Sequence, residues 1–121
     1  MKTINAKTAA PVANPHKINA CKLYDTEHAQ VMHITLAPGQ SLVRHITPVD
    51  VFFYVLEGTG IVEIGEEKGE AVQDTLIESP ARIPHCWHNQ SNGTLRIMVV
   101  KVPRPTEKTI MLPNEDTGRK D

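Results

Sequence analysis

Two segments of the chain carry the side chains best suited to chemistry. The first, RHITPVDVFFYVLEGTG (residues 44–60), begins beside His45 and contains Asp50, and the second, PARIPHCWHN (residues 80–89), contains His85. A neutral imidazole binds divalent metals and exchanges protons near neutral pH. These histidines are therefore candidates for a metal centre or for metal-free acid and base chemistry. The chain has no Ser-His-Asp order, phosphate-binding P-loop or dinucleotide glycine pattern that would indicate another reaction class.

Short β-strands must position these residues. Between residues 21 and 102 the chain is a series of short apolar runs, separated by turn signals rich in glycine, proline and asparagine. The runs VFFYVL, GIVEI and TLRIMVVKV consist largely of residues that favour strands. Because no apolar period of 3.6 residues is present, the pattern predicts an all-β sandwich or barrel.

Alternation along the strands predicts which side chains face the interior. In the run VMHITL, the residues Met32, Ile34 and Leu36 share one apolar face. Successive side chains of a strand point to opposite faces, so His33 is expected to point away from the interior.

The last apolar run, residues 95–102, is apolar on both faces apart from Arg96 and Lys101. A strand with two apolar faces indicates that its outer face is also covered. We therefore expect a second subunit to cover that face in a homodimer.

Composition divides the chain into three parts. Residues 1–20 are rich in Ala, Asn, Thr and Pro and are interpreted as an extended N-terminal arm, ordered against a partner. Residues 21–102 form the folded domain. Residues 103–121 carry three prolines and a charged end, which predicts an extended tail that frays at its end. His16 and His28 lie in arm and turn segments and are expected to be solvated.

Bulk properties exclude several classes of partner. The 121 residues suffice for one folded domain, and a formal net charge of −1 gives no reason to expect nucleic acid or an anionic membrane as a partner. No apolar run approaches the roughly 18 residues of a membrane span, and the N-terminus lacks the apolar region of a secretory signal. Two cysteines, Cys21 and Cys86, do not make a disulfide framework, so we expect reduced thiols in a cytoplasmic protein.

The order of the residues around His45 resembles the first of two motifs of the cupin family, G-x5-H-x-H-x(3,4)-E-x6-G. Gly39, His45 and Gly58 match this motif. Its second histidine falls on Thr47, and its glutamate falls on Val51. Two of the usual ligand positions are therefore vacant in this sequence.

The segment that follows resembles the second cupin motif, G-x5-P-x-G-x2-H-x3-N. Pro80, His85 and Asn89 match it, whereas Asp74 and Arg82 stand where the motif has glycines. Both motifs occur in order and at the expected separation on a strand-rich chain, and the resemblance covers about residues 30–102.

The resemblance implies an all-β fold of the double-stranded β-helix type, a cupin jelly roll of two antiparallel sheets with a pocket in one mouth. Cupins usually hold Mn, Fe, Ni or Zn through two histidines and a carboxylate from the first motif and one histidine from the second. Here the resemblance leaves His45 and His85 as metal ligands. A catalytic metal normally needs a third protein ligand, and Asp50 is the candidate. Strict alternation points Asp50 outward, so it would need a bulge to turn it inward.

Other residues of the two motifs are assigned to the pocket or to the outer surface. Thr47 and Val51 are expected to line the pocket, and so is Trp87, which has the same strand parity as the second-motif histidine. Cys86 and His88 have the opposite parity and are expected to face outward.

Two functions remain open. The first is a cytoplasmic protein that binds a small organic molecule in the pocket, either without catalysis or with weak dependence on a divalent metal. The alternative is a metal-dependent enzyme of the dioxygenase, isomerase or decarboxylase type that uses His45 and His85. The fold does not decide between them, because jelly rolls of this kind host both enzymes and binding proteins.

Overall fold

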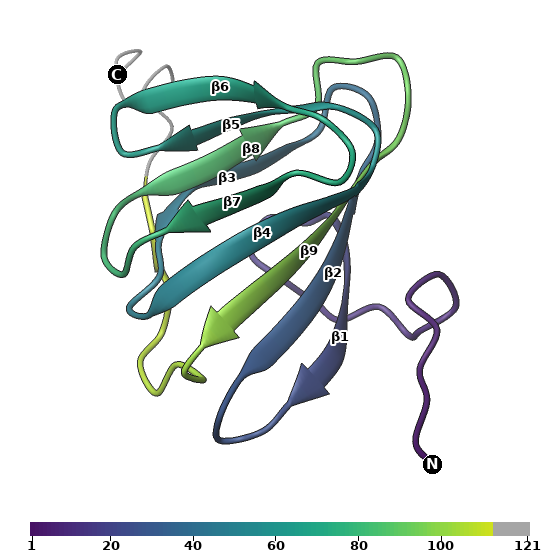
Figure 1. Ribbon diagram of the computed structural model, residues 1–121, viewed down its shortest axis with the longest axis vertical. Helices are drawn as coiled ribbons and strands as arrows, with labels where there is room; N and C mark the ends of the chain where they lie inside the picture. The colour runs from purple at the N-terminus through teal and green to yellow at the C-terminus, as the bar shows by residue number, and fades with distance from the viewer. Residues whose placement is uncertain (113–121) are drawn as a thin grey trace.

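The computed structural model describes residues 1–112 and consists of ten β-strands (Figure 1). The strands are β1 (Asn19–Asp25), β2 (Gln30–Leu36), β3 (Ser41–Ile46), β4 (Asp50–Glu57), β5 (Gly60–Ile64), β6 (Glu67–Ala71), β7 (Leu76–Ser79), β8 (His85–His88), β9 (Leu95–Val102) and β10 (Ile110–Met111). In this part of the chain no helix has the length and apolar character needed to cross a bilayer.

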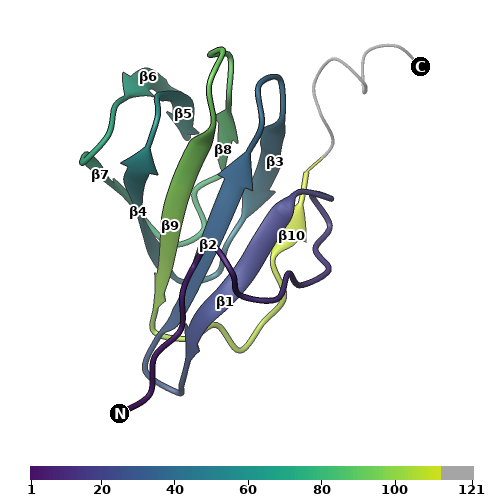
Figure 2. The same cartoon turned by 90° about the vertical axis from the view of Figure 1, so that its right-hand side faces the viewer.

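The strands form two antiparallel five-stranded sheets that face each other (Figure 2). Sheet A has the order β1-β2-β9-β4-β7, and sheet B has the order β10-β3-β8-β5-β6. The chain passes repeatedly from one sheet to the other, as in a jelly roll. The prediction of an all-β, double-stranded β-helix with two antiparallel sheets is confirmed.

The core lies between the sheets and follows the alternation of the strands. On β4 the inward residues Val51, Phe53 and Val55 are buried, and on β9 the inward residues Leu95 and Ile97 are fully buried. Burying one such side chain contributes roughly 1.5–3 kcal/mol, more than an exposed ion pair, which is usually worth less than about 1 kcal/mol. The apolar residues between the sheets therefore hold the fold together.

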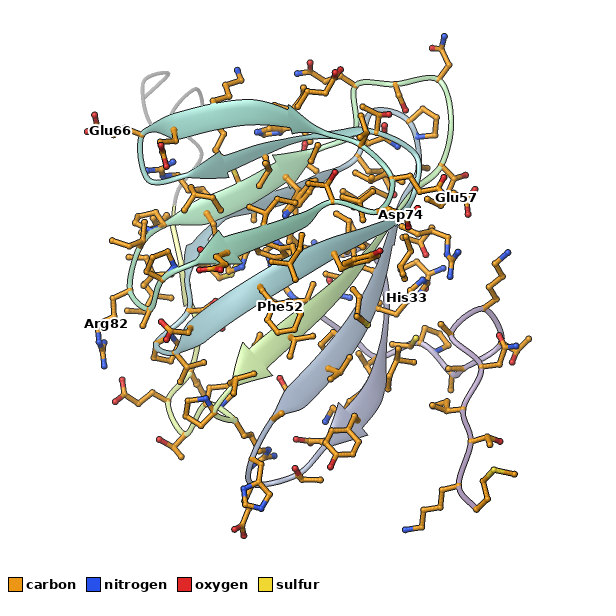
Figure 3. All side chains as sticks on the ribbon, in the orientation of Figure 1. His33, Phe52, Glu57, Glu66, Asp74 and Arg82 are labelled. Carbon is orange, nitrogen blue, oxygen red and sulfur yellow. The ribbon has the colours of Figure 1, made fainter. Side chains whose placement is uncertain are left out.

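The outer face of β9 is apolar, as the sequence indicates. Val100 is buried because Val31 of β2 and Phe52 of β4 are its cross-strand neighbours on the same face. Figure 3 shows Phe52 on this outer face of sheet A. The neighbouring strands thus shield part of the apolar row within one chain, and association into a homodimer stays a prediction.

The turn between β4 and β5 requires its two glycines. Gly58 has a positive φ of 84°, and a Cβ atom there would collide with the carbonyl oxygen of Thr94. A Cβ atom on Gly60 would lie 2.6 Å from Leu95 Cδ2 and 2.9 Å from Trp87 Cε3. The turn therefore packs against the β8–β9 connection and the core only without side chains at these positions.

Two residues that replace motif glycines adopt the backbone conformation of glycine. Asp74 has φ 70° and Arg82 has φ 67°, which lie in the left-handed region. Their amides anchor the two turns, since Asp74 N donates to the Val55 carbonyl at 2.8 Å and Arg82 N donates to the Thr47 carbonyl at 2.9 Å. The backbone at these two positions thus adopts the conformation expected of the motif glycines, although both residues carry side chains.

Segments at both ends of the domain pack against its sheets. Val12 N donates to Ala20 O, and the Asn14 side chain bonds the backbone of Ile18, so the last part of the arm is an ordered loop. Figure 2 shows this segment passing beside β10 before it enters β1. In the tail, β10 pairs with β3. The predicted frayed end of the tail lies outside the described residues.

Replacing Arg82 by glycine should stabilise the protein. Arg82 is exposed, so the main effect of Arg82→Gly is the removal of a Cβ atom from a left-handed residue. We expect its free energy of unfolding to exceed that of Arg82→Ala by about 1 kcal/mol, because alanine keeps the Cβ atom. Urea unfolding of both variants measures this difference. If the glycine and alanine variants have the same free energy of unfolding, the left-handed conformation at residue 82 carries no free-energy cost for a residue with a Cβ atom.

Candidate functional site

A cavity of about 160 Å³ lies between the two sheets. Strands of both sheets form its walls, and the end of the arm and one residue of the tail line the remaining part of it. Its lining residues are Asn14, Pro15, His16, Ile18, Ala20, Met32, Ile34, Leu42, His45, Thr47, Phe53, His85, Val99, Lys101 and Thr109. Most of the surface that these residues present is apolar, so the few polar groups determine what chemistry the cavity supports.

A bulge in β3 aims His45 into the cavity. Leu42 pairs with Trp87 and His45 pairs with His85, so the β3–β8 register shifts by one residue between them. Without that shift, Leu42 and His45 would have opposite parity and could not both face inward. Val43 and Arg44, which lie between them, have no partner in the β3–β8 register, and the backbone groups of Val43 bond side chains instead.

Both backbone groups of Val43 hold histidines. Val43 N donates to His16 Nδ1 at 3.0 Å, and the Val43 carbonyl accepts from His45 Nδ1 at 2.6 Å. A carbonyl oxygen only accepts, so the proton of neutral His45 resides on Nδ1 and its Nε2 is an acceptor. An amide only donates, so neutral His16 carries its proton on Nε2.

His45 and His85 form a direct hydrogen bond in the cavity. Their Nε2 atoms lie 3.0 Å apart, and since His45 Nε2 is the acceptor, His85 Nε2 carries the proton. His85 Nδ1 then accepts from the Ser79 hydroxyl at 2.7 Å, and Thr47 Oγ1 lies 3.2 Å from His85 Nε2. Every ring nitrogen of the pair has a partner when both rings are neutral.

Burial keeps the three cavity histidines neutral. Desolvation, with smaller contributions from His45, Lys101 and His16, lowers the pKa of His85 to about 3. The pKa of His16 is lowered to about 4, first by desolvation and then by His45 and Lys101. Desolvation also lowers the pKa of His45, although the hydrogen bond to the Val43 carbonyl opposes this shift. The hydrogen-bond roles and the directions of the pKa shifts both indicate that these three imidazole rings are uncharged.

The expectation that His16 is solvated is wrong. The ordered loop around Asn14 carries it over the cavity, where its ring packs edge-on against His45 with centroids 4.8 Å apart. No pattern in the arm predicts this, because the contact depends on the bulge at Val43. His28 is exposed, as expected.

Lys101 also lines the cavity, although it was not among the site residues predicted from the sequence. It follows Val99 on β9 with the same inward parity, so alternation alone could have placed it there. Desolvation lowers the pKa of its ammonium group, and it makes no ion pair with any carboxylate of residues 1–112.

The cavity does not fit the metal ion that the family usually carries. The 3.0 Å separation of the two Nε2 atoms would suit two ligands of one ion, but no third imidazole, thiolate or carboxylate comes within reach of both atoms in the described residues. Among residues 1–112 no carboxylate lines the cavity, and the Lys101 ammonium adds positive charge. Two neutral imidazoles beside a lysine leave a desolvated dication without compensation.

Of the remaining predicted site residues, one lines the cavity and the others lie elsewhere. Thr47 lines the cavity, as described. Asp50 does not, because it is exposed and its Oδ1 accepts from Ala81 N at 2.8 Å on the outside of the sandwich. Val51 and Trp87 point inward but lie in the hydrophobic core and are not among the residues of the cavity wall. Metal binding through His45, His85 and Asp50 therefore finds no geometric support and stays untested.

His33 faces outward, as alternation predicts, yet it is buried. It lies on the outer face of sheet A beneath the N-terminal arm, and Arg96 Nε donates to its Nε2 at 3.0 Å. Figure 3 shows His33 and Glu57 on the side where the arm leaves the domain, and Glu57 pairs with Arg96 at 3.4 Å. Cys86 and His88 also face outward, on sheet B.

Comparisons with known proteins agree with this fold. A family model described as a cupin domain matches residues 32–101. An uncharacterized protein of Methanocaldococcus jannaschii, MJ0764, is 25% identical over 85 residues, which cover 69% of this chain and 73% of that protein.

Solved structures show the same architecture. The protein TT1209 from Thermus thermophilus is 30% identical, with a TM-score of 0.75 over 87% of this chain and all of that one. The polyketide cyclase RemF from Streptomyces resistomycificus has a TM-score of 0.79 at 20% identity, covering 96% of this chain and 89% of RemF. At that identity the second likeness supports the fold alone.

Stability should fall as the pH drops below the ordinary range of histidine. The pKa of buried His85 is about 3 when folded and about 6.5 when unfolded, so only the unfolded chain binds this proton between those values. The stability that depends on neutral His85 is fully present above about pH 6.5 and is lost as the pH falls below that value. Between pH 7 and pH 5 we expect roughly 2 kcal/mol of lost stability from His85, measured by urea unfolding.

His85→Gln should show a smaller loss over the same pH interval, because glutamine does not titrate. His28→Gln is the matched control and should behave as the unsubstituted chain, since His28 is exposed. If the unsubstituted chain is equally stable at both pH values, the neutral network described above is wrong.

Restoring the vacant motif positions should create a metal site. Thr47→His with Val51→Glu adds two ligands beside His45 and His85, one of them negative, so affinity for Mn²⁺ should rise at least tenfold. Calorimetric titration measures the gain, and the same pair of substitutions in a His45→Gln background should lose it. Without metal the variant should be less stable, because Val51 is buried and a carboxylate would replace it. An unchanged affinity would show that the motif alignment of these positions is wrong.

Proposed function

This chain belongs to the cupin family, and we propose that its cavity binds a small organic acid without the help of a cavity metal. One observation carries the proposal: the cavity presents a lysine ammonium group among neutral imidazoles, and none of the lining residues within 1–112 is acidic. A partly desolvated cation without an internal counter-ion is a binding site for an anionic group.

The carboxylate of such a ligand would find two donors in the cavity. Lys101 supplies a charged ammonium group. His16 supplies its Nε2 hydrogen, which has no hydrogen-bond partner among residues 1–112 because only Nδ1 is engaged, by Val43 N. Hydrogen bonds to charged groups contribute about 1.5–3 kcal/mol each, so Lys101 should account for most of the discrimination between an acid and a neutral analogue.

The size and surface of the cavity limit the rest of the ligand. A volume of about 150 Å³ accommodates a molecule of benzene size, and the partly open cavity here has about 160 Å³. Ile34, Leu42, Phe53 and Val99 present apolar surface to it. The body of the ligand is therefore compact and apolar, with its acidic group directed to the end of β9.

Binding is favoured over catalysis by the state of the histidine pair. A general base works best when its pKa lies near the working pH. The pKa of His85 is about 3, and its Nδ1 lone pair is already used by Ser79. The pair fits a structural role at the base of the cavity, where it closes the polar side of the pocket.

Benzoate and benzamide are suitable probes, because they have nearly the same shape and differ in charge. We expect saturable binding of benzoate, at least tenfold tighter than that of benzamide, measured by calorimetry or by chemical-shift titration. Lys101→Met should remove this preference while leaving the affinity for benzamide within about twofold. His16→Gln should weaken benzoate binding by a smaller factor.

Lys68→Met provides the matched control, since Lys68 of β6 is exposed and remote in sequence from the cavity residues. This control should bind both probes as the unsubstituted chain does. Equal affinities for the two probes, or benzoate binding that survives Lys101→Met, would contradict the proposed recognition of an acid.

A further inference from the structure

Three metal-binding side chains meet on the outer face of sheet B, away from the cavity. Glu63 of β5 is the direct cross-strand partner of Cys86 of β8, so their side chains stand side by side on the same face. His88 is two residues beyond Cys86 and therefore shares that face. The cluster is a consequence of strand register, and its ligand atoms all lie within 4.8 Å of one another.

The distances within this cluster suit a single small cation. His88 Nε2 lies 2.9 Å from Glu63 Oε2 and 3.5 Å from Cys86 Sγ. Tetrahedral zinc, with bonds of about 2.3 Å to sulfur and 2.0–2.1 Å to nitrogen, holds such a sulfur and nitrogen roughly 3.5 Å apart. A modest outward shift of the carboxylate would complete three ligand directions that converge on one point.

Ser41 and Arg44 contact two of these side chains, His88 and Glu63, and help to orient them. Ser41, the cross-strand partner of His88, places its hydroxyl 2.9 Å from His88 Nδ1. A carboxylate only accepts, so His88 Nε2 carries a proton in its 2.9 Å contact with Glu63. When a cation binds, that proton would leave Nε2, and a proton on Nδ1 would be donated to Ser41, as behind metal-binding histidines. Arg44 Nη1 lies 4.0 Å from Glu63 Oε1, the carboxylate oxygen that does not bond His88.

We propose that Glu63, Cys86 and His88 form a site for a divalent zinc-like cation on the outer face of sheet B. A thiolate and a carboxylate supply two negative charges, which offset those of the ion. The cavity offers no such charge, so the two sites differ in the ligands they accept. The side chains of His88 and Glu63 are 30% and 26% exposed, so solvent reaches two of the three ligands, whereas Cys86 is buried.

A catalytic cysteine is the competing interpretation of this cluster, and the geometry opposes it. In a Cys-His-carboxylate triad, one ring nitrogen faces the sulfur and the other faces the carboxylate. Here Cys86 and Glu63 both face Nε2 of His88, and Nδ1 faces Ser41. Burial and the Glu63 carboxylate also raise the pKa of the Cys86 thiol to about 11, which disfavours a free thiolate nucleophile.

Cobalt(II) is a direct probe, because a thiolate bound to it gives a charge-transfer band in the near ultraviolet. The full chain, first dialysed against a chelator, should bind one equivalent of Co²⁺ with this band and release a proton. The band should persist in Cys21→Ser and disappear in Cys86→Ser, so each variant controls for the other thiol. Zn²⁺ added afterwards should displace the cobalt and abolish the band.

Further variants separate this site from the cavity and from a nonspecific thiol. Glu63→Gln and His88→Gln should each weaken Co²⁺ binding at least tenfold, and Ser41→Ala should weaken it severalfold or more. His45→Gln with His85→Gln should leave binding unchanged. The proposal is overturned if the unsubstituted chain gives no thiolate band, if the band survives Cys86→Ser, or if the cavity variant abolishes it.

Discussion

The candidate cavity site depends on one bulge in β3. The extra residue turns His45 inward beside Leu42 and releases the backbone of Val43 from the sheet ladder. The released carbonyl fixes the tautomer of His45, and the released amide draws in His16 from the arm. The first bond sets the direction of the His45–His85 hydrogen bond, and the second requires a neutral His16 ring, because an amide only donates. A regular strand would place none of these groups as they are.

Charge separates the two sites of this molecule. In the cavity, the ammonium of Lys101 and neutral imidazoles stand without a carboxylate from the described part of the chain, which favours anions and disfavours a dication. On the outer face of sheet B, the Glu63 carboxylate and the Cys86 thiol stand beside His88, which favours a dication. The cavity thus lacks two of the motif ligands, whereas three side chains of types that can ligate a metal stand together on the other side of the same sheet.

Much of the fold was predictable from the sequence, because alternation and glycine turns report local geometry directly. Motif spacing also brought His45 and His85 together, since it encodes the pairing of β3 with β8. The role of His16 was not predictable, because it depends on a bulge that no residue pattern announces. Lys101 could have been found from its parity with Val99. Strand alternation correctly predicts that the Trp87 side chain points inward. It cannot predict whether an inward side chain lies in the core, as Trp87 does, or in the cavity wall.

The hydrogen bonds described for the cavity require its histidines to form a neutral network of fixed tautomers around the proposed anion site. Long-range ¹H–¹⁵N correlation spectra of the imidazole rings at pH 7 test it most directly, because they report the protonated nitrogen of each ring. We expect a proton on Nδ1 of His45 and on Nε2 of both His85 and His16, and we expect benzoate to shift the His16 Nε2 resonance. A charged ring at pH 7, or a proton on Nε2 of neutral His45, would contradict it.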